Sequence, residues 1–474
     1  MSEVKMDDIV SLAKRRGFIY QGSEVYGGLS GTWDYGPLGV ALKRNIMNLW
    51  WKTFVEDREN MYGVDAAILM NQKVWQASGH VDTFTDPLVE CSNCHNRFRA
   101  DHLENDKCPA CGKTGSFGKP KAFNMMFKTV VGPVDLDPQI SLPTATSAKI
   151  KDNNYIYTVD WTKEKAEVEA RSHDEIALNV SYLRPETAQG IFTNFKNVVD
   201  SFYPDLPFGI AQQGKAFRNE ISPRDFVFRS REFEQMEVEY FVQPDKWEEA
   251  FEQWRTDIKA FLANLGIPAE NVHEFEVPQA DRAHYSKRTI DFEFDYPHKR
   301  DELLGLAYRT DFDLTNIQNA SGKSMEYTIK GTNDKFVPHV IEPSFGVERA
   351  LMAVLLSAYT EDEQNGEKRI FLKLPVHLAP VKVAVSPLLR NKPELVEKAR
   401  EVYTMLKKEL GAVMYDDNGN IGKRYRRQDE IGTPYCITID FDTLGNGTVT
   451  VRNRDTTEQK RVQIEELVND LDLQ

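Results

Sequence analysis

The sequence predicts an α/β protein in which an α+β body, built on an antiparallel sheet, is followed by a smaller α/β domain. Segments 207–220 and 225–243 are rich in β-branched and aromatic residues and are typical of two strands joined by a loop. A further strand at 337–342 runs directly into a helix that begins near Gly346. Beyond Leu372, strands and helices alternate to the end of the chain, which is the pattern of a compact α/β domain.

The remaining elements follow from apolar spacing and from turn residues. Gly36 and Pro37 introduce the first of several stretches in which apolar residues recur at helical spacing. Helices are expected on this ground at 38–54, 247–265, 392–410 and 462–471. Strands are expected at 381–388, 435–440 and 448–455. The polar, glycine-bearing stretch 360–368 is typical of a linker between the two domains.

Composition places the chain among globular proteins. Its 474 residues are enough for two or three domains, and 41% apolar with 28% charged residues excludes a disordered chain. No apolar run approaches the roughly 18 residues that a membrane-spanning helix needs, so no membrane partner is expected. The first 18 residues are charged throughout and lack the apolar core of a signal peptide. A cytoplasmic location is therefore expected.

Charge is distributed unevenly along the chain. The net charge of −14 argues against broad nucleic-acid binding. From Leu372 onward, however, 16 Lys and Arg balance 16 Asp and Glu, so the acidic excess lies entirely in the body. Inside the neutral tail, the run KRYRR at 423–427 combines cations with an aromatic ring. Such a run can contact RNA phosphates and stack on unpaired bases, although a solvated charged loop has the same composition.

Four of the five cysteines form two CxxC pairs, Cys91 with Cys94 and Cys108 with Cys111. Disulfides are not expected in a reducing compartment, whereas two such pairs suit a tetrahedral zinc site in a zinc-ribbon-like hairpin. The alternative is four free thiols that pack in the interior, which explains the spacing poorly. Cys436 lies alone in an apolar run and is expected to be a buried strand residue.

The stretch 217–241, FRNEISPRDFVFRSREFEQMEVEYF, carries charges of both signs along a segment that otherwise reads as strand. With period-2 alternation, one face would present, in order, Arg229, Arg231, Phe233, Gln235, Glu237 and Glu239. Guanidinium groups bind phosphates, an aromatic ring stacks on a base, and carboxylates hold an ammonium group. This order favours a nucleotide bound beside a small amine, and the alternative is a solvated outer face.

Three segments resemble the signature motifs of class II aminoacyl-tRNA synthetases. FRNE at 217–220, followed by Arg229 and Phe233, resembles motif 2; GVER at 346–349 resembles motif 3; Pro37 with its following helix resembles motif 1. In that class, motif 1 builds a dimer interface, so the resemblance implies a homodimer. It also implies ATP with Mg²⁺ as the energy source.

More narrowly, the chain resembles glycyl-tRNA synthetases of the single-chain, homodimeric bacterial type. The matching stretches lie in order over nearly the whole chain, and they are 17–45, 97–102, 182–192, 217–224, 231–239, 309–314, 342–349 and 423–436. The resemblance implies attachment of glycine to tRNA(Gly) through glycyl-adenylate. The expected domains are a catalytic first part at 1–84, an insertion with the four-cysteine module at 85–165, a catalytic second part at 166–365 with a helical insertion near 245–300, and an anticodon-binding domain at 370–474.

The resemblance also implies residue roles. Catalysis would rest on Arg218, Glu342 and Arg349. ATP would be bound by Arg218, Asn219, Glu220, Phe228, Arg229, Arg231, Phe233, Glu302, Leu303, Glu342, Gly346 and Arg349, with Phe233 stacked on adenine and Glu342 beside Mg²⁺. Glycine would be bound by Arg99, Glu186, Phe233, Gln235, Glu237, Arg309, Glu342, Ser344 and Gly346. The tRNA would be contacted by Lys423, Arg424, Arg426 and Arg427.

Several alternatives remain at this point. Arg309 could form a plain ion pair with Asp311 or Asp313, and Arg99 could merely brace the cysteine module. The stretch before Arg309 departs from the family pattern by lacking a Gly/Trp segment, which weakens the assignment of Glu302 and Leu303. The chain could also be a synthetase for another small amino acid, or a binding protein that has lost catalysis. Retention of the phosphate-binding arginines disfavours the latter.

Overall fold

The computed structural model describes residues 4–103, 106–132, 149–151, 154–156, 179–364 and 366–472. Two compact units are present. The first consists of Met1–Ala66, Glu186–Lys215 and Ser222–Gln474, and the second of Ala67–Pro185 and Ala216–Ile221. Parts of the expected insertion at 85–165, and the start of the following catalytic segment, lie outside the described residues.

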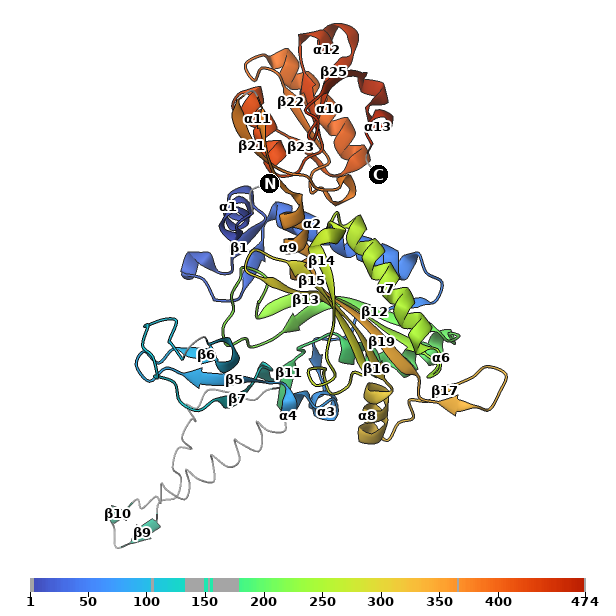
Figure 1. The fold of residues 1–474 in the computed structure, drawn as a ribbon. Helices are drawn as coiled ribbons and strands as arrows, with labels where there is room; N and C mark the ends of the chain where they lie inside the picture. The colour runs from blue at the N-terminus through green and yellow to red at the C-terminus, as the bar shows by residue number, and fades with distance from the viewer. Residues whose placement is uncertain are drawn as a thin grey trace. The chain divides into compact units, whose positions relative to one another are not determined.

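The first unit is built around a seven-stranded sheet with the order β14-β15-β16-β19-β13-β12-β3 (Figure 1). The strands are β3 (Met61–Gly63), β12 (Phe208–Phe217), β13 (Glu232–Val242), β14 (Val272–Glu276), β15 (Arg288–Asp295), β16 (Arg300–Thr310) and β19 (His339–Gly346). β3 runs parallel to β12, whereas β14, β15, β16, β19 and β13 pair antiparallel in succession. The antiparallel sheet expected from the sequence is therefore confirmed.

Alternation along the central strands separates an apolar face from a polar one. On β13, Met236 and Val238 belong to the main apolar core, and Glu237 and Glu239 point to the opposite face. β19 behaves in the same way, because Phe345 packs in that core while its neighbours face the other side. Both polar rows are buried, so helices must cover the polar face as well as the apolar one.

Helices cover both faces of this sheet (Figure 1). The main core contains residues of the sheet and of the helices α1 (Met6–Arg16), α2 (Pro37–Trp51), α7 (Trp247–Asn264) and α9 (Val347–Ala358), and of the π-helical turn at Lys52–Glu56. The second core contains residues of α6 (Ala188–Phe202) and α8 (Phe312–Ser321). The stripes predicted at 38–54 and 247–265 are buried as expected.

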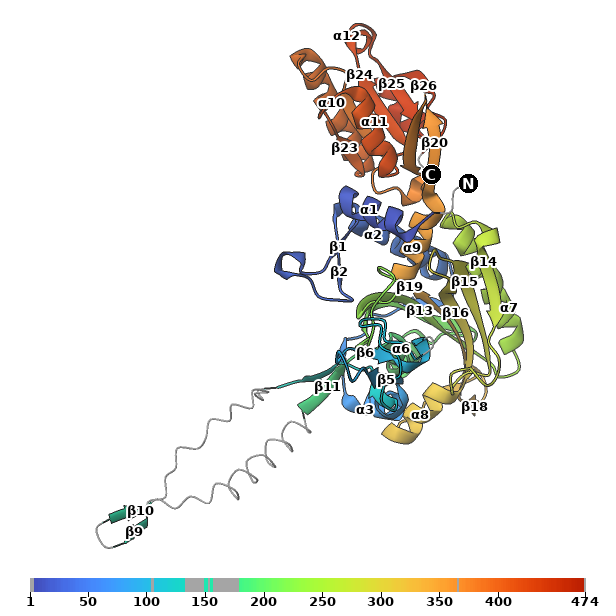
Figure 2. The same cartoon turned by 60° about the vertical axis from the view of Figure 1, so that its left-hand side comes forward.

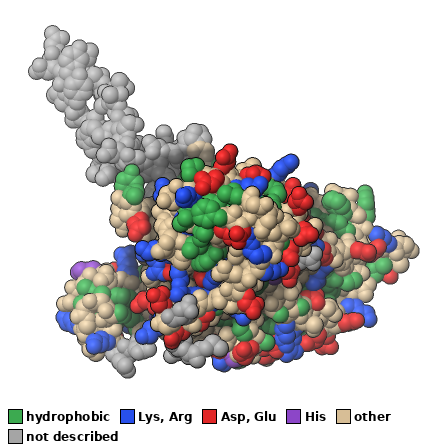
Figure 3. Space-filling view, turned by 90° about the horizontal axis from the view of Figure 1, so that it is seen from above, with side chains coloured by type: hydrophobic (Ala, Val, Ile, Leu, Met, Phe, Trp, Pro, Cys, Tyr) green, Lys and Arg blue, Asp and Glu red, His purple; other side chains and the backbone are tan. Residues whose placement is uncertain are grey.

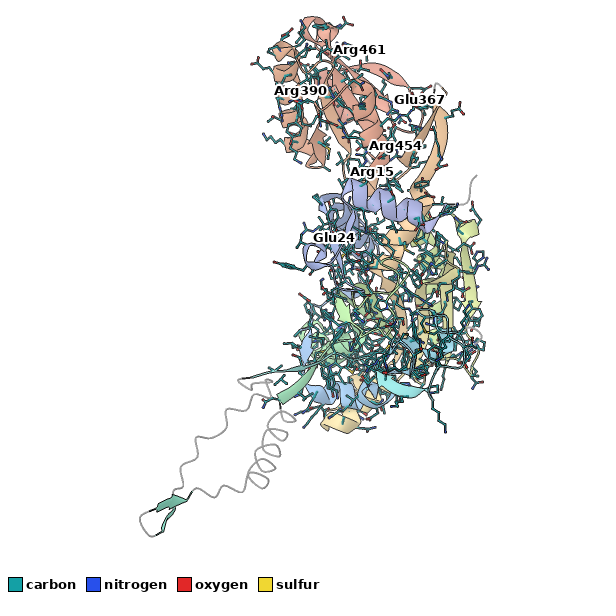
Figure 4. All side chains as sticks on the ribbon, turned by 90° about the vertical axis from the view of Figure 1, so that its left-hand side faces the viewer. Arg15, Glu24, Glu367, Arg390, Arg454 and Arg461 are labelled. Carbon is teal, nitrogen blue, oxygen red and sulfur yellow. The ribbon has the colours of Figure 1, made fainter. Side chains whose placement is uncertain are left out.

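Smaller elements complete the body. Before α2 come α1 (Met6–Arg16), β1 (Ile19–Gln21), a 3-10 turn (Glu24–Tyr26) and β2 (Trp33–Tyr35). The hairpin of β1 and β2 carries Glu24 at its outer end (Figures 2 and 4). Two short strands, β17 (Tyr327–Thr328) and β18 (Lys335–Phe336), form another hairpin, and a 3-10 turn at Ala269–Asn271 precedes β14.

The C-terminal part folds as a five-stranded sheet with the order β23-β22-β24-β25-β26. Its strands are β22 (Val383–Pro387), β23 (Val413–Tyr415), β24 (Tyr435–Ile439), β25 (Thr448–Asn453) and β26 (Gln459–Gln463). Its helices are α10 (Pro393–Leu410), α11 (Ile421–Glu430), α12 (Phe441–Asn446) and α13 (Leu467–Asp470), with 3-10 turns at Val376–Leu378 and Ile464–Glu466. A separate apolar core lies between sheet and helices, as expected for an α/β domain. Basic and acidic side chains are interspersed on the face seen in Figure 3.

The second unit contains two three-stranded sheets, β4-β11-β8 and β6-β5-β7. Its elements are β4 (Leu69–Met70), α3 (Gln72–Ala77), α4 (His80–Thr83), β5 (Thr85–Glu90), β6 (Arg97–Arg99), a 3-10 turn (Ala100–His102), β7 (Lys121–Asn124), β8 (Lys128–Val130) and β11 (Val180–Leu183). A further pair, β9 (Lys149–Lys151) and β10 (Asn154–Ile156), is antiparallel.

Four sequence-based expectations are corrected. Residues 225–231 are not a strand: 225–228 form a turn in which Asp225 and Phe226 adopt left-handed backbone angles (φ 58° and 57°), and the strand starts only at Glu232. The expected linker at 360–368 is part of the hairpin of β20 (Tyr359–Gln364) and β21 (Glu367–Leu372). The helical insertion near 245–300 is helical only in α7 and then supplies two strands of the sheet. The helix expected at 462–471 is shorter and follows strand β26.

None of the helices in the described part of the chain is long and apolar enough to cross a membrane.

Candidate active site

A group of buried polar side chains, called the pocket below, lies on the sheet face covered by α6. Glu237 on β13 pairs directly across the ladder with Ser344 on β19. The Ser344 hydroxyl donates to Glu237 Oε1 at 2.7 Å, and the Thr187 hydroxyl donates to Glu237 Oε2. Gln235, two residues earlier on the same face, donates from Nε2 to Ser344 Oγ at 3.4 Å. Two adjacent strands and the start of α6 therefore fix the orientation of the Glu237 carboxylate.

Arg309 is the cation of this pocket. It lies at the end of β16 and is 1% exposed. Its Nε and Nη2 donate to the two carboxylate oxygens of Asp313 at 2.8 and 2.9 Å, and its Nη1 donates to Glu342 Oε2 at 2.7 Å. The ring of Tyr285 lies 3.7 Å from the guanidinium carbon. Burial opposes the charge of Arg309, but Asp313 and Glu342 outweigh it and hold its pKa well above the usual value.

The carboxylates of the pocket outnumber its cation. Oxygens of Glu237, Glu239 and Glu342 all lie within 4.8 Å of one another. Burial, followed by the negative charge of Glu186, raises the pKa of Glu237. Burial also raises the pKa values of Glu239 and Glu342 well above the usual value, in each case reinforced by neighbouring carboxylates. Such a site gains most from a ligand that brings a positive charge and N–H donors.

The second half of the candidate site surrounds Arg349, at the start of α9. Its Nη1 contacts Glu302 on β16, through the carbonyl oxygen at 3.1 Å and the carboxylate at 2.9 Å. Its guanidinium carbon lies 4.7 Å from the centre of the Phe228 ring. Leu303, in contrast, is 1% exposed and packs in the main core, where it makes an apolar contact only. Gly346 is the residue at which β19 turns into α9.

The motif 2 arginines occupy a loop and not a strand face. The Arg229 N–H donates to the Arg224 carbonyl at 3.3 Å, which closes the turn. Arg231 is tied to the β1–β2 hairpin, since its N–H donates to Gly31 and its Nη1 to the Ser30 carbonyl, at 2.7 and 2.8 Å. The continuous face of alternate residues predicted from Arg229 onward is therefore wrong before Glu232, while Phe233, Gln235 and Glu237 do alternate on β13.

Four of the expected site residues belong to the second unit. Arg218 follows β12, donates from Nε to the Pro185 carbonyl at 3.1 Å, and lies over the Phe84 ring at 5.4 Å. The Asn219 N–H donates to the Met125 carbonyl at 2.7 Å, and Glu220 is 8% exposed. Arg99 is bound by Asp86 at 2.6 Å and by Asp101 at 2.7 Å.

The four paired cysteines come together. Sγ of Cys91 lies 3.7 Å from Sγ of Cys111, and Sγ of Cys94 lies 3.6 Å from Sγ of Cys108. All four sulfur atoms lie within 4.8 Å of one another. A tetrahedron with Zn–S bonds of about 2.3 Å places its sulfurs about 3.8 Å apart, so the donor set fits zinc. Cys436 is buried on β24, as expected.

The basic run at 423–427 is helical, because it lies within α11. Arg424 is 2% exposed, and its guanidinium donates to the carbonyls of Pro387, Asp417 and Gly419. Arg427 pairs with Asp416 at 2.8 Å, and Arg426 lies 3.6 Å from Glu367. Arg424 is therefore a buried structural residue, contrary to its expected exposure to RNA, because its side chain points into the domain.

Sequence reasoning missed several pocket residues. Thr187 and Gln189 were not singled out, and Asp313 was considered only as an ion-pair partner of Arg309. Gln189 donates to Asp313 at 2.8 Å and so extends the pocket to α6. Glu239 was expected only as the second carboxylate of the alternating face, and it lies two residues beyond Glu237 on that face.

Comparison with family models agrees with this geometry. Residues 169–359 match the tRNA synthetase class II core domain (G, H, P, S and T). Residues 382–472 match the anticodon binding domain. The first range contains the pocket and the Arg349 region, and the second covers the C-terminal sheet.

Curated relatives extend over almost the full chain. The glycine–tRNA ligase of Thermobifida fusca is 46% identical over 98% of this chain and 96% of its own length. That of Streptomyces coelicolor is 45% identical over 98% of each chain. A solved prolyl-tRNA synthetase of Giardia lamblia, in complex with prolyl-adenylate, has a TM-score of 0.62 over 98% of this chain and 76% of that chain, at 15% identity, and shows the fold alone. The chain therefore belongs to the glycine–tRNA ligases, the class II aminoacyl-tRNA synthetases that attach glycine to tRNA(Gly) through an adenylate.

Proposed function

We propose that the pocket formed by Glu186, Glu237, Glu342, Ser344 and Arg309 binds the substrate glycine. The observation that carries this assignment is the surplus of buried carboxylates around Glu237, whose orientation Ser344 and Thr187 already fix. The ammonium group of glycine would supply the missing positive charge and three N–H donors. Gln235 and Phe233 would border the pocket from the same strand face, and Gly346 would border it from β19. Arg99 completes the proposed glycine-binding set.

The nucleotide would lie beside the glycine pocket. Phe233 would stack on adenine, Arg229 and Arg349 would hold the distal phosphates, and Arg218 would bind the α-phosphate together with the attacking carboxylate. Asn219, Glu220, Phe228, Arg231 and Glu302 complete the proposed ATP-binding set. The contacts of Arg349 with Glu302 and with the Phe228 ring support this assignment, because they hold the guanidinium in one direction. The burial of Leu303 limits it to supporting the strand that carries Glu302.

Adenylation brings two anions together, the glycine carboxylate and a phosphate, which repel each other. Arginines can neutralise both charges and align the attack without a covalent intermediate on the protein. Mg²⁺ would add further neutralisation of the phosphates, and Glu342, beside which it would lie, offers the carboxylate oxygen that this ion prefers. Arg218, Glu342 and Arg349 are the proposed catalytic residues.

Selection of glycine over larger amino acids is proposed to be steric. Contacts with one added methyl group discriminate by only about 1–3 kcal/mol, so a pocket gains little from recognising an absent side chain. A wall of fixed side chains, in contrast, excludes alanine by overlap. Glu186 and Glu237 would form this wall as well as bind the ammonium group.

The decisive experiment is ATP–pyrophosphate exchange with glycine, alanine and serine. The native enzyme should exchange with glycine alone, and Glu237→Ala should lose most glycine-dependent exchange because the ammonium group loses a partner. Glu232→Ala, at the exposed start of the same strand, is the matched control and should retain exchange. Unchanged glycine exchange in Glu237→Ala would refute the pocket assignment.

We also propose that Cys91, Cys94, Cys108 and Cys111 bind a structural zinc ion. Supporting evidence is the sulfur geometry, in which all four Sγ atoms lie within 4.8 Å of one another. The purified protein should contain about one zinc per chain by atomic absorption. Cys108→Ser should lose the metal, whereas Cys436→Ala, which changes the fifth cysteine, should keep it. Equal zinc content in both variants would contradict the assignment.

The remaining proposals concern the whole enzyme. Residues 370–474 are proposed to bind the anticodon of tRNA(Gly), with Lys423, Arg426 and Arg427 facing the RNA and Arg424 anchoring their helix. The segment 85–165 is proposed as an insertion between two parts of the catalytic domain, 1–84 and 166–365. A homodimer through the motif 1 helix and a cytoplasmic location, where tRNA and ATP are available, complete the proposal. Sedimentation at the mass of two chains is the expected result for the dimer.

A further inference from the structure

Glu348, the residue before the motif 3 arginine, joins three segments that are far apart in the sequence. It lies in the first turn of α9 and is 6% exposed. Its Oε1 accepts a hydrogen bond from the Tyr35 hydroxyl at 3.1 Å, and its Oε2 accepts one from the Glu234 N–H at 2.9 Å. Tyr35 ends β2, just before the motif 1 helix, and Glu234 follows Phe233 on β13.

The hydrogen bond from the Glu234 N–H to Glu348 takes the place of a backbone hydrogen bond between β13 and β19. The β13–β19 ladder ends at the pair Gln235–Gly346, because the chain then turns into α9. The residue opposite Glu234 would be Val347, which is already helical, so no strand carbonyl is available there. The Glu348 carboxylate accepts this N–H in place of a strand carbonyl. An unpaired buried N–H destabilises a fold more than an average hydrogen bond stabilises it, so this contact holds β13 firmly.

A lysine and a second carboxylate close the cluster on the motif 1 side. Lys43 of α2 lies 2.9 Å from Glu234 Oε2 and 4.3 Å from the centre of the Tyr35 ring. The side chains of Lys43 and Glu234 are only 12% and 14% exposed. The motif 1 segment is therefore linked to Glu234 in two ways, directly through Lys43 and indirectly through the hydrogen bonds of Tyr35 and Glu234 to Glu348.

The two neighbours Glu348 and Arg349 make contacts with different parts of the body. Glu348 holds the strand segment that carries Phe233, and Arg349 contacts Glu302 and Phe228 in the proposed phosphate site. The peptide N–H that Glu348 binds is the one directly after Phe233. A shift of α9 relative to β13 would thus change the separation between the ring proposed for adenine and the guanidinium proposed for phosphate.

We infer that Glu348 is a positioning residue for ATP, which sets the spacing between Phe233 and Arg349 by clamping α9 to β13 and to the motif 1 segment. The inference rests on the proposed ATP site. It assigns to Glu348 no contact with substrate and no part in proton transfer. Its effect should therefore appear in the KM for ATP and much less in the KM for glycine, because Glu237 lies four residues beyond Phe233 on β13 and is held by its own hydrogen bonds from Ser344 and Thr187.

The test is steady-state ATP–pyrophosphate exchange by the full-length enzyme, with the KM for ATP and the KM for glycine measured separately. Glu348→Leu keeps the volume but cannot accept either hydrogen bond, and the KM for ATP should rise about tenfold, with a change below about twofold for glycine. Glu348→Gln can still accept from Glu234 N–H through its amide oxygen and meet Tyr35 with its amide group, so it should restore the KM for ATP to within about twofold. An unchanged KM for ATP in Glu348→Leu, or equal rises for both substrates, would overturn the inference. Failure of Glu348→Gln to restore the KM would overturn it as well.

Two further variants keep the test informative. If Glu348→Leu does not fold, as judged by its melting temperature, Tyr35→Phe removes one of the two contacts and should raise the KM for ATP by about two- to fourfold. No change in Tyr35→Phe would then count against the inference. Phe233→Ala distinguishes a failure of the proposed ATP site from a failure of the positioning role of Glu348. If Phe233→Ala leaves the KM for ATP unchanged, the proposed ATP site fails; if it raises that KM while the Glu348 variants do not, only the positioning role fails.

Discussion

Buried glutamates at Glu237, Glu239, Glu342 and Glu348 define this protein at the scale of single residues. Glu237, Glu239 and Glu342 lie in the pocket, where hydrogen-bond donors are few. Among the described residues, neither carboxylate oxygen of Glu239 has a hydrogen-bond partner. Glu348 differs, because each of its oxygens accepts a hydrogen bond. Burial nevertheless raises the pKa of Glu348 to about 7, and the charge of Glu234 adds to the effect. The groups of neighbouring elements that face it are Tyr35, Lys43, Glu234 and Lys215.

This pKa predicts a pH dependence of stability that Glu348→Gln should remove. The folded-state pKa lies above the unfolded value of 4.5, so the folded state favours the protonated acid. The resulting stabilisation is complete below pH 4.5 and is lost as the pH rises through about 7. Between pH 5 and 8, native enzyme should lose about 2–3 kcal/mol of unfolding free energy relative to Glu348→Gln. Denaturant unfolding at both pH values measures this difference, and parallel changes in the two proteins would contradict it.

Helix α2 illustrates what decides stability at the scale of an element. Its Pro37 occupies the first turn, where a missing N–H does no harm, and its buried side follows the predicted spacing at Leu42, Ile46 and Trp50. Gly39 looks out of place, since glycine weakens a helix relative to alanine. A Cβ at this position, however, would lie 1.8 Å from the Phe18 carbonyl oxygen. The close approach of the backbone before β1 requires glycine here.

Gly39→Ala should therefore destabilise the enzyme although it improves helix propensity. The clashing atoms are backbone, which cannot rotate away, so a loss of about 1–3 kcal/mol or more is expected. Gly445→Ala, in helix α12, is the matched control, because a Cβ there meets no atom within 4 Å. It should be neutral or stabilising by up to about 1 kcal/mol. Melting temperatures of the two variants, which should move in opposite directions, check this prediction.

At the scale of the whole molecule, buried ion pairs connect the β20–β21 hairpin with the C-terminal sheet. Arg369 of β21 contacts Asp362 of β20 and lies 3.3 Å from Asp429 of α11, and Asp429 also binds Arg452 at 2.7 Å. Arg454, labelled in Figure 4, donates to the Leu374 carbonyl at 2.9 Å. Helix α11, which carries the proposed tRNA-binding residues, is thus anchored to the hairpin that follows α9.

Loss of two of the cations of α11 should weaken tRNA use and spare adenylate formation. A double variant with Lys423→Ala and Arg426→Ala removes two proposed phosphate contacts, so the KM for tRNA should rise and the slope of log affinity against log salt should fall by about 1.5. Glycine-dependent pyrophosphate exchange, which needs no tRNA, should stay unchanged. Lys398→Ala with Lys408→Ala, on helix α10 of the same domain, serves as the control and should leave tRNA affinity near the native value. An equal effect of both pairs would argue against recognition by α11.

The sequence was most informative where one period or one motif dominated. The stripes of α2 and α7, the strand-to-helix junction at Gly346, and the alternation of Gln235 and Glu237 were all predictable, because side-chain direction repeats regularly along helices and strands. The turn at 225–228 was not, since its left-handed residues Asp225 and Phe226 carry no glycine signal. The β20–β21 hairpin was not predicted either. Its charged residues are typical of a linker, and the ion pair of Arg369 with Asp429 joins residues that are distant in the sequence.

By itself, the sequence determined the antiparallel body, the α/β tail, the family and the paired cysteines, because these depend on local periodicity and on motifs that lie close together in the chain. Only the tertiary structure decided which charges meet. In the folded chain Asp313 pairs with Arg309, and the Arg424 side chain is buried within its own domain. Glu348 accepts the Glu234 N–H, which has no strand partner at the end of the β13–β19 ladder. The physical reason is that burial and hydrogen bonding of a polar group depend on neighbours distant in sequence. Local sequence patterns do not identify these neighbours, because folding alone brings them into contact.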